Sequence, residues 1–342
     1  MLSKVVKFLV ILILFMPSAI ASSFEVHFLD VGQGDAAVLC CDGEYAIIDG
    51  GSANQSSFVY SYLKNNLNIK HLKYVFASHP HEDHIGGLSA ALNACSAGRI
   101  FSPVASYESD AFKSFSKYAD AQGVFIEIPN DGDVFHLGSA IIKVLSRGID
   151  SGSENDLSLI LQVTHNDLSF LFTGDAGAAS ESALVQDKID IASQVLKIPH
   201  HGAEGSSSRE FIAAVDPEIA IISVGSNNQY DHPSDWVVSD LCLSSCKIYR
   251  TDLHGTIIIK DNGDSLLIEP EKDRPFVSNV EASSFYVPIT GESFYIGNKN
   301  TMKFHQSTCN SVQDMSDKNK IEFFERATAI NAGYVPCKRC TP

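Results

Sequence analysis

The chain has 342 residues, of which 44% are hydrophobic and 19% charged, so it has a globular composition and the length for one large domain and one small one. Its formal net charge of −16 excludes a protein that binds polyanions over its whole surface. Residues 294–342 differ from the rest because they carry seven Lys or Arg against four acids.

Residues 1–21 have the pattern of a secretory signal peptide. Lys4 and Lys7 precede an apolar run over residues 8–16, and small residues stand before the expected cleavage after Ala21. The apolar run is shorter than the ~20 residues that a membrane span requires, which argues against an uncleaved anchor. We therefore expect a secreted or periplasmic mature chain with no stable membrane association. The oligomeric state stays open.

The pattern of an α/β domain follows. Short apolar or alternating runs between turn residues predict strands over residues 24–29, 36–40, 45–48, 74–77, 123–128, 141–145, 157–163, 168–172, 195–198, 219–224, 256–260 and 265–268. Helical spacing predicts helices over residues 57–66, 85–93, 179–184 and 209–214. Because hairpins come first and strands then alternate with helices, we expect two β-sheets with helices outside them over residues 22–269.

Two further segments complete the chain. Residues 270–293 mix Pro, Ser, Glu and Gly with weak periodicity and are predicted to be a linker. Residues 294–342 are predicted to fold as a separate unit that is too short to bury much core, so a metal is expected to stabilise it.

Five of the eight cysteines precede this last unit, and an exported chain permits disulfides. An odd number leaves at least one thiol without a partner inside the chain. The sequence leaves the pairing open among Cys40, Cys41, Cys95, Cys242 and Cys246.

The strongest chemical signal is the run Ser78-His-Pro-His-Glu-Asp-His-Ile-Gly-Gly87, directly after an apolar strand. A tight loop lets His79 and His81 face one metal while Asp83 and His84 turn toward a second. Zinc takes imidazole nitrogen and carboxylate oxygen at about 2.0–2.2 Å, which suits this set. The alternative is a histidine-rich surface loop.

This run resembles the His-x-His-x-Asp-His motif of the metallo-β-lactamase superfamily, and the resemblance covers residues 24–269. Three further motifs of that family follow the expected strands in order: Ile48-Asp-Gly-Gly51, Phe172-Thr-Gly-Asp175 and Ile198-Pro-His-His-Gly202. The resemblance implies an αββα sandwich and two divalent metals, with zinc expected and manganese as the alternative.

The family's pattern also implies roles for residues of the later motifs. Asp175 would bridge both metals, and His201 would bind the second metal, which leaves His200 to touch substrate. The reverse assignment of the two histidines stays open. Asp83 would hold a metal while it orients the nucleophilic hydroxide.

Within the superfamily, the chain resembles the ComEC-like hydrolase subgroup. The resemblance rests on Phe28-Leu-Asp-Val-Gly-Gln-Gly-Asp35, Leu196-Lys-Ile-Pro-His-His-Gly202 and Asp231-His-Pro-Ser234. It implies that carboxylates lie beneath the metal loop and fix the imidazoles, for which Asp30, Asp35 and Asp49 are the candidates. A plain glycine turn is the alternative for Asp30 and Asp35.

One ligand of the wider family has no obvious counterpart between the histidine cluster and Asp175. His136 and His165 are two candidates. The ComEC-like subgroup has instead a polar residue in a segment like Glu154-Asn-Asp-Leu-Ser158, so Asn155 or Asp156 would complete or border the first metal's ligands.

Three residues are candidates to meet the negative oxygens of a substrate: His200, His232 and Arg250. Two metals activate a water and stabilise the charge that develops on a phosphoryl or acyl group, and these side chains would add to that. For His232 and Arg250 the alternative is a loop or strand-end residue without substrate contact.

The C-terminal unit holds a Cys3His set of His305, Cys309, Cys337 and Cys340, which suits a closed structural zinc site. Disulfides or free thiols are the alternative. Residues 294–342 resemble the metal-binding module of the Ada DNA-repair protein, in which four cysteines bind zinc and one accepts a methyl group.

His305 stands at the first of those positions, so methyl transfer is not expected. The resemblance implies DNA contact through the basic residues Lys299, Lys303, Lys338 and Arg339, with plain surface charge as the alternative.

These features together predict an exported two-metal hydrolase whose basic module holds DNA, that is, a phosphodiesterase or nuclease. Two alternatives come from other classes. One is a small-ester hydrolase such as a phosphocholine esterase, a lactonase or a β-lactamase. The other is a DNA-binding accessory of uptake or biofilm whose hydrolase site is vestigial.

Overall fold

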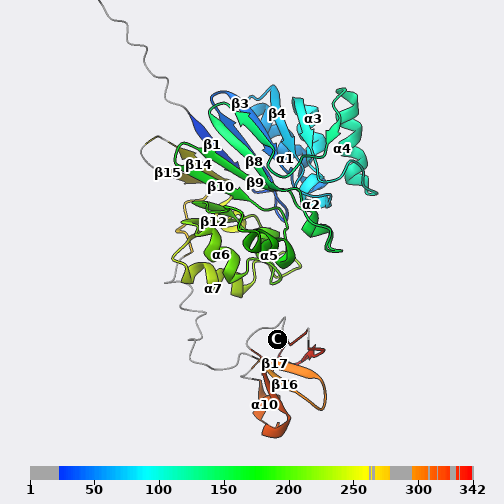
Figure 1. The fold of residues 1–342 in the computed structure, drawn as a ribbon, viewed down its shortest axis with the longest axis vertical. Coiled ribbons are helices and arrows are strands. Elements are labelled where there is room, and N and C mark those ends of the chain that lie inside the picture. The colour runs from blue at the N-terminus through cyan, green and yellow to red at the C-terminus, as the bar shows by residue number, and fades with distance from the viewer. Residues whose placement is uncertain are drawn as a thin grey trace, which may run out of the picture.

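The structure is a computed structural model of the chain (Figure 1). It describes residues 23–261, 263, 266–277, 295–306, 309–313, 315–323, 329–330 and 332–340. The predicted signal peptide and residues 278–293 of the predicted linker lie outside the described residues.

An eight-stranded sheet forms one half of the large domain. Its order is β15-β14-β1-β2-β3-β4-β5-β6. The strands are β1 (Phe24–Phe28), β2 (Ala37–Cys41), β3 (Glu44–Ile48), β4 (His71–Phe76), β5 (Ser96–Phe101), β6 (Ile126–Glu127), β14 (Ile257–Asp261) and β15 (Leu266–Pro270). The early hairpins are antiparallel, whereas β3 to β6 run parallel.

A seven-stranded sheet forms the other half, in the order β13-β12-β11-β10-β9-β8-β7. Its strands are β7 (Val134–Leu137), β8 (Ala140–Ser146), β9 (Ile160–His165), β10 (Leu168–Phe172), β11 (Val195–Lys197), β12 (Ile219–Ile222) and β13 (Lys247–Arg250). The strands from β10 to β13 are parallel, so their carboxyl ends lie at one edge.

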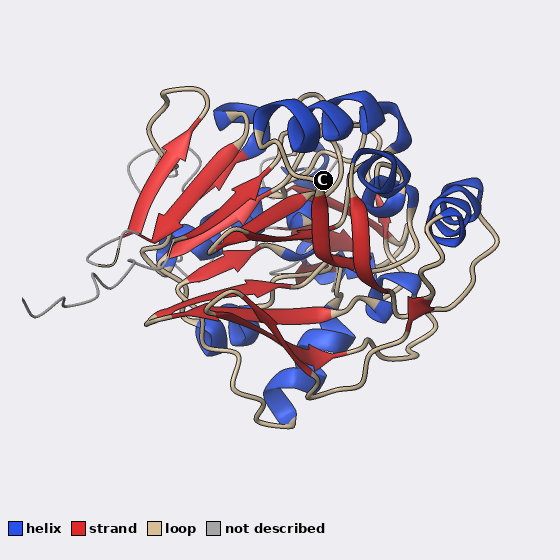
Figure 2. Ribbon diagram, turned by 90° about the horizontal axis from the view of Figure 1, so that it is seen from above, coloured by secondary structure: helices blue, strands red, loops and turns tan. Residues whose placement is uncertain are grey.

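The two sheets pack face to face through the alternate residues of their strands. In β12, Ile219 and Ile221 join the core between the sheets, whereas Ala220 and Ile222 face the helices on the outer side. This division follows from the two-residue period of a β-strand. Figure 2 shows the result as two layers of strands between outer layers of helices.

Helices cover the outer faces of both sheets. Against the eight-stranded sheet pack α1 (Ser56–Ser61), which continues as a π-helical turn over Tyr62–Asn66, then α3 (Leu88–Ala94) and α4 (Asp110–Ala121), with the short α2 (Glu82–Ile85) before α3. Against the seven-stranded sheet pack α5 (Ala178–Gln186), α6 (Arg209–Val215) and α7 (Asp235–Leu243), and α8 (Thr251–His254) follows β13. The predicted αββα class is thereby confirmed.

Several elements differ from the sequence-based expectation. Helices α4 and α7 and strands β5, β7 and β13 were not predicted. The start of α4 has a helix signal that was overlooked, because Ser109 caps the helix by accepting from Phe112 N. The strand expected over residues 123–128 is only two residues long, and Phe125 before it is 81% exposed.

The C-terminal unit has a small sheet of its own, in the order β18-β16-β17-β19. Its elements are β16 (Tyr295–Asn298), β17 (Lys303–Gln306), α10 (Asn310–Gln313), β18 (Lys320–Phe323) and β19 (Val335–Pro336). Phe304, Phe323, Ala329 and Tyr334 form a small apolar cluster there, which agrees with the expectation of little core.

The five cysteines of the large domain are free thiols in the structure. Four of them are buried, and Cys40 is partly buried. Burial raises the pKa of the Cys246 thiol to about 12, and the same cause raises the pKa of Cys40 to about 12. Thiols that stay protonated are poor nucleophiles, so these cysteines act as small apolar side chains.

A hydrogen-bond network around His165 connects the hairpin ends of the two sheets. His165 Nδ1 lies 2.6 Å from Asp261 Oδ2, and His165 Nε2 lies 3.1 Å from Ser139 Oγ. Ser139 donates its hydroxyl to Asp42, and the His165 ring stacks on Phe24. Asp42 and Asp261 belong to the eight-stranded sheet, so the network joins the two sheets at this end.

His165→Ala is expected to lower the free energy of unfolding by about 1–3 kcal/mol, because it removes a buried ring that contacts both Asp261 and Ser139. Chemical denaturation measures this loss. Activity per folded molecule should stay unchanged, since β10 separates His165 from Asp175 by about 17 Å. Loss of bound metal at unchanged stability would instead identify His165 as a ligand.

Candidate metal centre

The carboxyl ends of the central strands meet at one edge of the sandwich, where chemically active side chains gather. Asp49 follows β3, the run from Ser78 to His84 follows β4, and Asp175 follows β10. The pair His200-His201 follows β11. Parallel strands place their carboxyl ends together, and this is the usual location of sites in α/β folds.

Glycines allow the loops at this edge to approach one another closely. A Cβ on Gly34 would collide with the Asp83 carbonyl, and Gly34 has φ +135°, which disfavours other residues. A Cβ on Gly87 would collide with the Gly50 carbonyl. The glycines of three motifs therefore let the metal loop lie directly against the loops that follow β1 and β3.

Four overlapping groups of side chains at this edge have the geometry of ligand sets, and two of them lack Asp35, whose carboxylate is paired with Lys197. His79, His84 and Asp175 form one group, and Asp83, His84 and His201 form another; within each group the ligand atoms lie within 4.8 Å of one another. His84 Nε2 is 3.1 Å from Asp175 Oδ1, and His201 Nε2 is 3.3 Å from Asp83 Oδ2.

These spacings fit a metal ion. Two ligand atoms at 2.0–2.1 Å from one tetrahedral zinc lie about 3.4 Å apart. His84 Nε2, His201 Nε2 and Asp175 Oδ1 are buried and have no hydrogen-bond partner. Buried polar atoms without a partner are rare, and cations held by these ligand groups would satisfy them.

The carboxylates behind the imidazoles hold them in place. Asp49 Oδ2 lies 2.9 Å from His84 Nδ1, and Asp49 Oδ1 accepts from Ser78 N at 2.7 Å. Asp35 Oδ1 lies 3.3 Å from His201 Nδ1, which also lies 2.9 Å from the Ser223 carbonyl. Such contacts at Nδ1 leave Nε2 of each ring free to face the cluster.

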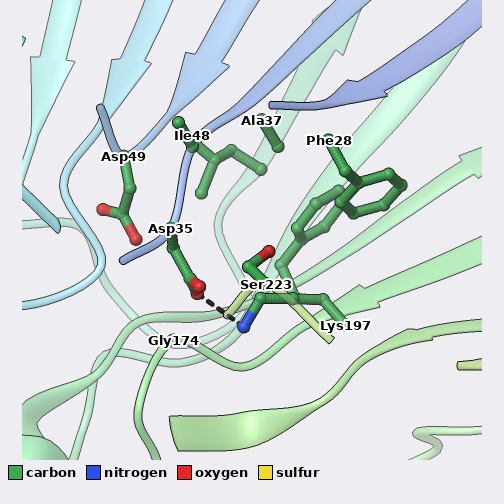
Figure 3. Close-up of a pocket in the computed structure, with 10 residues that line it drawn as sticks. Phe28, Asp35, Ala37, Ile48, Asp49, Gly174, Lys197 and Ser223 are labelled. Carbon is green, nitrogen blue, oxygen red and sulfur yellow. Dashed lines mark ion pairs between the residues drawn. The ribbon is translucent and has the colours of Figure 1, made fainter. Parts of the chain in front are cut away.

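A buried lysine lies beneath Asp35. Lys197 Nζ is 2.6 Å from Asp35 Oδ2, and Figure 3 shows this ion pair at a small pocket between the sheets. Apolar side chains such as Phe28, Ile48 and Phe172 line the pocket. A charge in such surroundings needs a partner, so Lys197 keeps Asp35 ionised and oriented.

The electrostatics favour cations at the cluster. Burial alone would lower the pKa of His84, but the carboxylates of Asp175 and Asp49 raise it well above its usual range. Burial also opposes charge on His201, yet Asp175 and Asp35 raise its pKa to about 9. Burial would raise the pKa of Asp175, but His84 and His201 hold it well below its usual range. The ionised carboxylates thus stabilise positive charge beside them, whether it is carried by a protonated histidine or by a metal ion.

His81 and His200 lie beside the cluster and not within either ligand group. His81 Nδ1 is 3.0 Å from His79 Nε2, and His81 Nε2 is 2.9 Å from Glu154 Oε2. The His200 side chain is 33% exposed, and its Nε2 lies 3.8 Å from Asp175 Oδ2. Asn155 Nδ2 lies 3.3 Å from that same nitrogen of His200. The structure thus brings His201, and not His200, into the buried set.

Of the other residues predicted from the sequence, His232 lies beside the site, whereas Arg250 and Asp30 have other partners. The His232 ring centroid lies 5.7 Å from that of His200, and burial lowers the pKa of His232 to about 4. Arg250 is bound to Asp252, with an Nη2 to Oδ2 distance of 2.7 Å. Asp30 Oδ1 accepts from Gly32 N at 3.4 Å and Asp30 Oδ2 lies 3.6 Å from Lys272 Nζ, so Asp30 closes the glycine turn.

Three candidates for the missing ligand have other roles in the structure. His136 is exposed in β7, and His165 belongs to the network at the opposite end of β10. Asp156 accepts from Gly177 N and Ser180 Oγ at the start of α5. Asn155 is the candidate that reaches the site, and its buried Oδ1 has no hydrogen-bond partner.

Sequence reasoning missed Lys197, Glu154 and Ser78 as contributors to the site. One signal was available for Lys197, because a lysine inside the apolar strand β11 requires a buried carboxylate. Glu154 meets His81 across 73 positions of sequence, which no local pattern indicates.

The C-terminal unit brings its predicted ligand set together. Ligand atoms of His305, Cys309, Cys337 and Cys340 lie within 4.8 Å of one another. Burial would raise the pKa of Cys337, but the amides of Arg339 and Cys340 lower it, which favours the thiolate that zinc binds. The basic residues Lys299, Lys303, Lys338 and Arg339 are exposed.

Comparison with known proteins agrees with this geometry. The model of the metallo-β-lactamase superfamily matches residues 29–226, and that of the metal-binding domain of Ada matches residues 282–342. ComE operon protein 3 of Bacillus subtilis is 31% identical over 266 residues, which cover 72% of this chain and 34% of that protein. Competence protein ComA of Neisseria gonorrhoeae is 29% identical over 231 residues, covering 67% of this chain and 31% of that protein.

The chain thus spans about a third of the length of these curated relatives. Among solved structures, the metallo-β-lactamase fold protein YhfI from Bacillus subtilis is 11% identical, covers 70% of this chain and 100% of its own, and has a TM-score of 0.48. Within the described part of this chain, no helix has the length and apolar character to cross a membrane. With these matches the predicted resemblance is confirmed: the chain belongs to the metallo-β-lactamase superfamily, has ComEC-like competence proteins as homologues, and ends in an Ada-like zinc-binding domain.

Proposed function

We propose that the chain is an exported phosphodiesterase that cleaves DNA with two divalent metals. The observation that carries this proposal is the buried cluster around Asp175, where His84 Nε2, His201 Nε2 and Asp175 Oδ1 are buried without a hydrogen-bond partner and belong to overlapping ligand groups. Buried polar groups without hydrogen bonds destabilise the fold, which argues against a vestigial site. One relative is named a competence protein, and competence is the uptake of DNA.

The ligands follow from the two groups. His79 and Asp175 would hold one metal, with His81 and Asn155 at its border, and Asp83 and His201 would hold the second. His84 belongs to both groups, but its Nε2 has one lone pair and would bind one of the two metals. Bound metals would supply a Lewis acid for a phosphoryl oxygen and would lower the pKa of water.

The residues that face solvent would act on the substrate. Asp83 has a side chain that is 32% exposed, so its carboxylate reaches both the cluster and the solvent and can orient a water molecule. Burial lowers the pKa of His200 and of His232, so both rings are neutral and can each donate one N–H to a phosphoryl oxygen.

The export proposal rests on residues 1–21, with their basic start, apolar run and small residues before Ala21. The proposed role of the C-terminal unit rests on charge. Residues 22–293 carry a net charge of about −21, which repels DNA, whereas residues 294–342 carry about +3. The basic unit would therefore hold the polyanion near an acidic catalytic domain.

The decisive experiment incubates the mature protein with single-stranded DNA, double-stranded DNA and a small chromogenic phosphodiester, each with and without chelator. We expect cleavage of DNA that chelator abolishes and that added zinc or manganese restores. If the protein hydrolyses the small ester but does not cleave DNA, the nuclease proposal is wrong and the protein is a small-ester hydrolase.

Replacement of Lys299, Lys303, Lys338 and Arg339 by alanine in the full chain should weaken action on long DNA and leave turnover of a small phosphodiester unchanged. Each lost phosphate contact should reduce the slope of log affinity against log salt by about 0.7–0.9. DNA binding at a series of salt concentrations measures this slope. An unchanged slope would mean that these residues do not hold DNA.

A further inference from the structure

The loop that follows β12 is built around one asparagine. Asn228 Nδ2 donates to the Gly225 carbonyl at 3.0 Å and to the His232 carbonyl at 2.7 Å. Its Oδ1 accepts from Tyr230 N at 3.1 Å and from His232 N at 3.0 Å. Four hydrogen bonds from one side chain fix the backbone on both sides of Tyr230, so the loop presents this residue in a defined position.

Tyr230 is a large aromatic side chain that the core does not need. It is 57% exposed, and the apolar clusters of the large domain do not include it. One face of its ring stacks on His232, with centroids 5.5 Å apart and an interplanar angle of 27°. An exposed aromatic ring held flat in this way can receive a second flat ring.

The stack continues toward the metal centre. The His232 ring lies 5.7 Å from the His200 ring and 6.4 Å from the His201 ring, centroid to centroid. His201 Nε2 belongs to the buried ligand group, and Tyr230 lies at the solvent end of the series. A group stacked on the outer face of Tyr230 is therefore separated from the buried ligand group by the rings of Tyr230, His232 and His201, a distance that a strand of a few nucleotides spans.

We propose that Tyr230 is a stacking platform for a nucleobase within a few nucleotides of the scissile phosphate, an assignment that rests on the proposed cleavage of DNA. Each nucleotide carries a flat base beside its phosphate, and every base has a π-face, so the platform accepts any sequence. Duplex bases are already stacked on both sides, so the platform favours single-stranded or frayed DNA. Tyr230 thus determines specificity and takes no part in the chemical step.

The test compares Tyr230→Ser with Tyr230→Phe in the full-length chain on two short single strands, one with normal bases and one with abasic residues. On the normal strand, Tyr230→Ser should lower kcat/KM by about 5- to 150-fold, the range for loss of one stacked base. Tyr230→Phe keeps the ring and should stay within about 2-fold of the wild type. On the abasic strand, Tyr230→Ser should equal the wild type.

The control variant is Phe125→Ser, which removes another exposed aromatic ring, directly before β6, the last strand of the eight-stranded sheet. It should change neither substrate's kcat/KM. Equal losses for Tyr230→Ser on both strands would mean that Tyr230 only supports the loop, and no loss on either would mean that no base stacks there. Both results would overturn the inference.

A binding measurement separates this inference from the proposed function. A single strand that contains 2-aminopurine loses fluorescence when that base stacks. The full-length chain can be titrated into this strand, and the fluorescence reports binding without any need for cleavage. Quenching by the wild type but not by Tyr230→Ser supports the platform even if DNA is not cleaved, in which case the nuclease proposal alone fails. Equal quenching by both proteins would overturn the platform whatever the cleavage result.

Discussion

Asp175→Ala is expected to lower kcat/KM by at least about 1000-fold, which corresponds to ~4 kcal/mol of transition-state stabilisation. The carboxylate of Asp175 lies 3.1 Å from His84 Nε2 and 3.6 Å from His201 Nε2, so it contacts a histidine of each proposed metal position. Its removal also takes away the negative charge that stabilises a cation in a buried place. The metal content of the purified protein should fall together with the activity.

The matched control is Asp167→Ala. Asp167 is an exposed aspartate at the turn before β10, whereas Asp175 follows the other end of the same strand. The control should keep full activity and metal content, as measured by steady-state kinetics and mass spectrometry of the metals. An Asp175→Ala protein with normal metal content and turnover would contradict the two-metal proposal.

The parts of the site that the sequence predicts are those carried by short motifs at strand ends. The run from His79 to His84 follows an apolar strand directly, and Asp175 does the same after β10. A strand end fixes where such residues lie, because all parallel strands of a sheet end at the same edge. The structure brings these motifs together at one edge, although they are far apart in the sequence.

The parts that were not predicted depend on tertiary packing. Lys197 has its partner Asp35 in another sheet, and His81 meets Glu154 from a separate loop. Arg250 has the charge to bind a substrate, but the nearby Asp252 takes its guanidinium in the structure. A sequence gives the charge of a side chain but not which opposite charge lies within reach after folding.

In the fold, too, elements with a local sequence signal are predicted and those that depend on tertiary pairing are not. The predicted hairpins and most central strands are present, because apolar runs in strands are contiguous. The missed strand β5 contains Gly98 and Arg99, which interrupt its apolar pattern. Its pairing with β4 and β6 supplies the context that the local sequence lacks.

The pair His200-His201 provides the last test, because both residues have left-handed backbone angles and yet point to different surroundings. His201 is buried, with Nδ1 engaged by Ser223 and Asp35 and with Nε2 facing Asp83. His200 is one-third exposed and touches Asn155 and His232. The two residues are adjacent and of the same type, so replacing each one by alanine compares a buried histidine with a partly exposed one.

His201→Ala should lower the number of bound metals per chain, together with activity, because it removes a buried nitrogen that has no hydrogen-bond partner and belongs to a ligand group. His200→Ala should keep the metals and lower kcat by about 100- to 10,000-fold, the usual range for loss of a group that acts on the reacting atoms. Mass spectrometry of the metals and steady-state kinetics on one phosphodiester distinguish the two effects. The reverse pattern, with metal lost from His200→Ala and retained in His201→Ala, would exchange the two roles and place the second metal closer to solvent.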